Sequence, residues 1–238
     1  MKFRILSTYV TSFLSPALQP VAFLPLNKQS AGLELVSRAN LAVLNNVTWS
    51  AGENSSLQLS GAPNSFVMVP NHPGSDLDTR TSITLLLHVF PTGNRGSILS
   101  FHEDGLGLQI CQEGVIDGKG ILSARFVWRD ITHPPALAKA VFNMNSWNFI
   151  GASYDHETGI ARLWHDGNEV EAKYLGRKQE LATQFCIRIG ALENAGNARC
   201  FRGRVANLRI FAEPLGKESI MTIGGIRSEE HTSELQSR

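Results

Sequence analysis

The chain has 238 residues, with 22 Lys and Arg against 21 Asp and Glu, so its formal net charge is +1. This balance, without any run of five basic residues, disfavours a nucleic-acid-binding protein. Hydrophobic residues make up 42% and charged residues 18%, which suits one domain with a large core, and no apolar stretch reaches the roughly 18 to 20 residues of a membrane span.

The first 20 residues are similar to a secretory signal peptide, because Met1-Lys2-Phe3-Arg4 precedes a modest apolar segment. Ser and Thr dilute that segment, so an artefactual or truncated start is the alternative. The sequons at Asn46 and Asn54 agree with secretion and make both asparagines candidate glycosylation sites. We therefore expect an extracellular protein, either secreted or the ectodomain of a membrane protein.

Short apolar runs separated by Gly, Asn, Asp and Pro follow from about Ser65, which is the pattern of strands joined by turns in an all-β sandwich. Asp166-Gly167 favours a tight turn with two positive φ angles. Val205 is out of phase with Leu208, which predicts a β-bulge near Ala206-Asn207. Strands are expected at 65–70, 82–90, 97–101, 106–111, 122–128, 147–154, 160–165, 168–174, 185–190 and 200–211.

The last residues resemble the translated read-through of a common sequencing-library adapter over the eleven residues 227–237. We therefore treat 227–238 as not native, with a genuine polar tail as the alternative. If the transcript ended there, further domains or a membrane anchor would follow Ile226.

Six segments stand out by their order along the chain: 23–27, 64–71, 77–84, 147–155, 159–164 and 201–205. This order resembles the laminin G-like family. The resemblance implies a concanavalin A-like fold over residues 21–220, a two-sheet antiparallel jelly-roll sandwich that is usually one module of a larger adhesion protein. It also implies rim loops that bind glycan, protein or calcium.

The same resemblance makes Asp104 the candidate calcium ligand, because it precedes the strand at 106–111 as the family's metal-binding Asp does. The alternative, which we favour, is an Asx-turn residue before Gly105. Asp155 and Asp166 are weaker candidates for calcium. The histidines are isolated along the sequence, so zinc is not indicated.

Catalytic chemistry is not indicated either. Glucanases of this fold need two facing carboxylates, typically as Glu-x-Asp-x-x-Glu, and that spacing is absent. Glu103 and Asp104 are adjacent and would point to opposite faces of a strand. We therefore predict a binding or adhesion module and no enzyme, with glycan or an extracellular protein as the partner. A spacer without a ligand and a degenerate glycoside hydrolase are the alternatives.

The sequence also allows predictions about the burial of two tryptophans and about the role of Asp78. Trp147 is expected in the core. Trp128 is the first candidate for an exposed platform, because Arg129 and Asp130 follow it at a strand end, but the favoured interpretation of a tryptophan in such a strand pattern is core or inter-sheet packing. Asp78 is expected to be structural, either pairing with Arg80 or capping loop amides.

The three cysteines allow one internal disulfide. Cys186 and Cys200 begin strands that are expected to be neighbours and enclose a loop of about fifteen residues, so a disulfide there would stabilise by about 3 kcal/mol. Cys111 is then a buried free thiol or pairs with a lost C-terminal segment.

Overall fold

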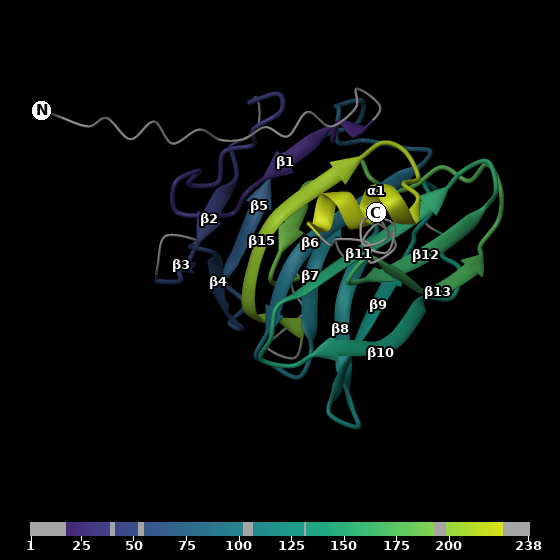
Figure 1. The fold of residues 1–238 in the computed structure, drawn as a ribbon. Coiled ribbons are helices and arrows are strands. Elements are labelled where there is room, and N and C mark those ends of the chain that lie inside the picture. Colours follow the sequence, from purple (N-terminus) through teal and green to yellow (C-terminus); the bar gives the residue numbers. More distant parts are fainter. Residues whose placement is uncertain are drawn as a thin grey trace, which may run out of the picture.

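The computed structural model describes residues 18–38, 41–51, 55–101, 107–130, 132–192 and 199–225. These residues form two antiparallel sheets that face each other across a common core, with one short helix on the outside (Figure 1). The all-β, two-sheet sandwich expected from the sequence is confirmed. No helix among the described residues is long and apolar enough to cross a membrane.

One sheet has eight strands in the order β13-β12-β11-β6-β15-β4-β3, with β1 also paired to β15. Its strands are β1 (Ala22–Leu24), β3 (Thr48–Trp49), β4 (Leu57–Ser60), β6 (Ile83–Pro91), β11 (Asn148–Asp155), β12 (Ile160–His165), β13 (Asn168–Tyr174) and β15 (Arg202–Phe211). The predicted meander is confirmed, because β11 pairs with β12 and β12 with β13.

The other sheet has seven strands in the order β10-β9-β8-β7-β14-β5-β2. Its strands are β2 (Val43–Asn45), β5 (Phe66–Val69), β7 (Gly96–Phe101), β8 (Gln109–Ile116), β9 (Lys119–Arg125), β10 (Leu137–Asn143) and β14 (Ile187–Ile189). The sequence patterns did not predict β2, β3, β4 or β10. The first three have only two to four residues, and β10 is largely exposed.

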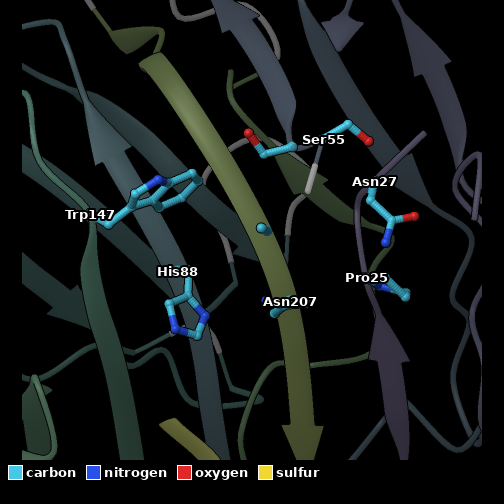
Figure 2. A pocket seen from close by; sticks show the side chains of 8 residues that line it. Pro25, Asn27, Ser55, His88, Trp147 and Asn207 are labelled. Carbon is cyan, nitrogen blue, oxygen red and sulfur yellow. The ribbon is translucent and has the colours of Figure 1, made fainter. Parts of the chain in front are cut away.

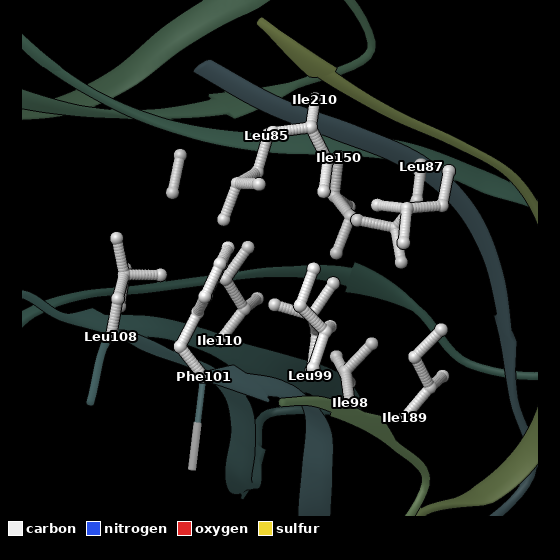
Figure 3. Packing of buried hydrophobic residues seen from close by; sticks show 14 of the residues in the cluster. Leu85, Leu87, Ile98, Leu99, Phe101, Leu108, Ile110, Ile150, Ile189 and Ile210 are labelled. Carbon is white, nitrogen blue, oxygen red and sulfur yellow. The ribbon is translucent and has the colours of Figure 1, made fainter. Parts of the chain in front are cut away.

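The core lies between the two sheets and follows from the period of two along each strand (Figure 3). Leu85 and Leu87 of β6 and Ile150 of β11 point inward from the eight-stranded sheet, where Leu99 and Phe101 of β7 meet them. All five are fully buried. Removing such a side chain from water stabilises the fold by about 1.5 to 3 kcal/mol.

A second, smaller apolar cluster lies on the outer face of the eight-stranded sheet. The helix α1 (Lys217–Gly224) lies over this face (Figure 1), and its Ile220 is fully buried. Gly225 ends the helix with φ 69°, a left-handed conformation that glycine adopts without strain. The sheet residues in this cluster are Leu86, Phe149, Trp164 and Phe211.

Two local predictions are confirmed on the same sheet. Asp166 and Gly167 both have positive φ, 47° and 77°, in the turn between β12 and β13. The register of β15 against β6 shifts between Ala206 and Arg209, and Asn207 has φ 55°. The predicted bulge therefore exists, and it lies at the centre of the outer face.

The expected Cys186–Cys200 disulfide is not formed, because both residues are free thiols, as is Cys111. The strands that they begin are not neighbours: β14 belongs to the seven-stranded sheet and β15 to the eight-stranded sheet.

The register along β7 gives the physical reason. Ile187, which follows Cys186, lies opposite Phe101, whereas Cys200 bridges to Ser97. Four residues of strand, about 13 Å, separate those two positions along β7. A disulfide requires Cα atoms within about 7 Å, so these two cysteines cannot bond without moving a strand.

Candidate functional site

A hollow of about 340 Å³ lies on the part of the outer face of the eight-stranded sheet to which Trp147 and the bulge belong. Figure 2 shows Trp147 and His88 on one side of it, Asn207 near its centre, and Ser55, Asn27 and Pro25 on the other side. Five segments distant in sequence therefore contribute to it. We call it the Trp147 hollow.

Trp147 is the largest side chain of this hollow and is 40% exposed. It precedes β11 on the strand face that carries Phe149, but Phe149 is buried within the cluster that α1 covers. The ring of Phe90 meets Trp147 edge-on at 5.7 Å, and the guanidinium of Arg204 lies 5.2 Å from its centroid. The prediction that Trp147 belongs to the core is wrong, because the sheet continues beyond the cover of the helix.

His88 forms one side of the hollow from the centre of β6. Its neighbours in the sheet are Phe149, 4.9 Å away between ring centroids, and Ala206 of the bulge. Its Nδ1 atom is buried and makes no hydrogen bond to any residue that the structure describes. Burial lowers the pKa of His88, and the charge of Arg209 lowers it further. The imidazole is therefore neutral at pH 7, with one nitrogen able to bond a ligand hydroxyl.

The bulge places Asn207 in the hollow. Its backbone N–H donates to the carbonyl of Pro25 at 3.0 Å, which ties β15 to the segment after β1. The opposite side is polar: Ser55 accepts a hydrogen bond from the N–H of Lys28 at 2.9 Å, and Ser56 bonds Ser50 at 2.9 Å. The hollow thus combines one aromatic face with amide, hydroxyl and imidazole groups.

The sequence contained two signals for this site. His88 is a polar residue in a strand that is apolar from Leu85 to Leu87, and the phase break near Asn207 marked a bulge, a feature that often occurs beside functional sites. Neither signal indicated that the two residues would lie on the same open part of a sheet, because that depends on the pairing of β6 with β15.

The residues singled out from the sequence lie elsewhere. Asp104 and Asn54 fall outside the described residues, and Asn46 is exposed with φ 45°. Asp155 bonds the hydroxyl of Thr158 and two turn amides, and Asp166 accepts the N–H of Phe149. Both aspartates therefore have turn-forming contacts. Among the described residues no group of three His, Cys, Asp or Glu side chains could hold a metal ion.

Asp78 is structural, as expected, but its partner is Arg129 and not Arg80. Arg129 bonds both carboxylate oxygens, at 2.9 and 2.7 Å, and Arg80 pairs instead with Glu180. Trp128 is only 7% exposed and packs 5.2 Å from the ring of Tyr154. The favoured interpretation of Trp128 as a packing residue is therefore confirmed.

The family model of the concanavalin A-like lectin/glucanases superfamily, laminin G-like type, matches residues 60–221. The chain belongs to this family, as the resemblance indicated. No sequence among curated proteins matches it significantly.

Solved structures with the same fold include binding domains of bacterial toxins. The botulinum neurotoxin serotype G binding domain superposes with TM-score 0.68 at 13% identity, covering 86% of this chain and 50% of that one. The serotype D ligand binding domain in complex with N-acetylneuraminic acid gives 0.69 at 15%, covering 87% and 50%. The binding domain of Paraclostridial Mosquitocidal Protein 1 gives 0.63 at 16%, covering 81% and 49%. The chain therefore spans about half the length of these structures, and the likeness concerns the fold.

Proposed function

We propose that this domain is an extracellular carbohydrate-recognition module that binds a sugar in the Trp147 hollow. The exposed face of Trp147 carries the proposal. Indole rings stack on the apolar C–H face of a sugar ring, and the surrounding polar groups bond its hydroxyls. In this hollow His88, Asn207 and the serines occupy those positions around the indole.

The rigidity of the hollow supports the proposal. Trp147 packs against both Phe90 and Arg204, and Asn207 is fixed by the bulge, so little conformational freedom would be lost on binding. His88 adds a half-buried imidazole to the wall of the hollow beside the indole. This site lies on a sheet face, not on the rim loops that the family resemblance indicated.

The lining also favours recognition over hydrolysis. Glycoside hydrolysis requires a pair of carboxylates beside the scissile bond, and no described residue that lines the hollow is acidic. Calcium binding at Asp104 and a role within a larger adhesion protein stay part of the proposal, and neither contributes to the chemistry of this hollow.

The test is a glycan array with the full chain, followed by titration of the best ligand against Trp147→Ala. We expect the variant to lose about tenfold or more in affinity, because the stacking surface disappears, and Trp147→Phe to keep part of it. Tyr174→Ala is the matched control, since Tyr174 is an aromatic residue 65% exposed on β13 of the same sheet. An array without binding, or equal binding by Trp147→Ala, would refute the proposal.

A further inference from the structure

A second hollow, of about 490 Å³, lies next to the first on the same sheet. Its lining includes Arg202 and Arg204 of β15, Gln58 and Ser60 of β4, and Thr92. Arg202 lies opposite Ser60 and Arg204 lies opposite Gln58. The two arginines are two residues apart on β15, so both lie on its outer face. We call it the arginine hollow.

The two hollows adjoin at two points. Ser50 of the arginine hollow and Ser56 of the Trp147 hollow share a hydrogen bond of 2.9 Å between their hydroxyls. Arg204 lines the arginine hollow while its guanidinium lies 5.2 Å from the Trp147 ring. One ligand can therefore contact both hollows across Arg204.

The two hollows together carry positive charge from Arg202 and Arg204. None of the described residues that line either hollow is Asp or Glu, and neither Arg202 nor Arg204 forms an ion pair with another described residue. The stacking of Arg204 on Phe90, 4.0 Å from the ring centroid, fixes the guanidinium plane and leaves its N–H edge for other partners. Guanidinium groups so placed match a carboxylate or a sulfate.

We propose that the ligand is an acidic oligosaccharide of at least two units, with one sugar on Trp147 and the carboxylate or sulfate of its neighbour in the arginine hollow. This inference rests on the proposed function and names the ligand class of the same face. Trp147 supplies affinity for a sugar ring, and the Arg202–Arg204 pair selects the charged unit.

The test compares matched oligosaccharides that are neutral, uronic-acid-containing or sulfated, titrated with the full chain at low and at physiological salt. We expect at least one acidic series to bind about tenfold more tightly than its neutral counterpart, and the carboxylated and sulfated series show which anion is selected. Arg202→Gln should lower the affinity for the acidic series toward that of the neutral series, because one of the two guanidinium groups of the arginine hollow is lost.

Arg125→Gln is the control for non-specific attraction. Arg125 belongs to β9 of the other sheet, where it lines a separate polar hollow with Arg95 and Arg199, and its loss removes the same charge from the molecule. The acid preference should survive this change. Equal loss of preference in both variants, or a preference that Arg202→Gln leaves intact, would overturn the inference.

The outcomes also separate the two proposals. Neutral and acidic sugars that bind equally, with both dependent on Trp147, would refute the arginine subsite and leave the recognition module standing. Absence of any Trp147-dependent sugar binding would refute both.

Discussion

The carboxylate of Asp78 is buried in the loop before β6 and accepts four hydrogen bonds. Its side chain is 1% exposed and accepts both Arg129 bonds, the hydroxyl of Thr183 at 3.1 Å and the N–H of Gly74 at 3.0 Å. It thereby joins three segments distant in sequence. The neighbouring Arg80–Glu180 pair has both side chains about half exposed and offers a comparison within the same loop region.

We expect Arg129→Leu to lower the free energy of unfolding by about 3 kcal/mol, because it leaves a buried carboxylate without its counter-ion. Arg80→Gln should cost less than about 1 kcal/mol, as exposed pairs do. Urea unfolding at pH 7 measures both. Equal small losses would show that water reaches Asp78 and that the burial in the structure does not hold in solution.

The pH dependence gives a second arm of the same measurement. Burial would raise the pKa of Asp78, but the hydrogen bonds from Arg129, Gly74 and Thr183 together hold it below the ordinary value of 3.8. The stabilisation is therefore present above the unfolded-state pKa and is lost as the pH falls through the lower folded-state pKa. The difference between wild type and Arg129→Leu should be full above pH 5 and shrink toward pH 2.

At the scale of the element, β15 is the strand that contributes residues to both hollows. In its first half Arg202, Arg204 and Ala206 face outward. The bulge shifts the alternation by one residue, so that Leu208 and Ile210 face the core. Asn207 is the residue in the left-handed region, where Asn is tolerated and a β-branched residue is strained.

We expect Asn207→Gly to change the free energy of unfolding by less than about 1 kcal/mol, because glycine adopts this backbone conformation. The variant should bind sugar more weakly, because it lacks the side-chain amide of Asn207. Asn207→Val should instead destabilise the fold by about 1 to 3 kcal/mol through strain at positive φ. Thermal unfolding and ligand titration of the two variants separate backbone from side chain. If Asn207→Gly binds sugar as tightly as the wild type, the side-chain amide of Asn207 does not contact the ligand.

The sequence pattern predicted some of these elements and missed others. Alternation and turn residues predicted the long central strands, the Asp166-Gly167 turn and the bulge, since these depend on local spacing. Alternation did not distinguish Trp147 from a core residue, because β11 has both faces buried where α1 covers it. That cover is a tertiary contact without any local signal.

The cysteines show a similar limit. Their spacing permitted a disulfide, but which strands are neighbours depends on the assignment of β14 and β15 to different sheets. The candidate site was missed for the same reason, since His88, Trp147 and Asn207 lie far apart in sequence and meet only through the pairing of β6 with β11 and β15.

At the scale of the whole molecule, α1 divides the outer face of the eight-stranded sheet. One part of the face is apolar and covered by the helix, and the other is polar, aromatic and open. The backbone is anchored before the helix, because Thr84 Oγ1 donates to the carbonyl of Glu213 and accepts the N–H of Leu215. The helix is therefore part of the sandwich, and its packing should contribute to global stability.

We expect Ile220→Ala to lower the free energy of unfolding by about 2 to 4 kcal/mol, or roughly 5 to 15 °C in Tm for a domain of this size. Ile220 is fully buried on the sheet face, so the variant loses apolar contacts and leaves a cavity. Thr222→Ala is the control on the same helix, because Thr222 is exposed and its hydroxyl bonds only the helical carbonyl of Glu218. Calorimetry that shows equal Tm values for the two variants would mean that α1 is not docked on the sheet in solution, and the outer face would then be open along its whole length.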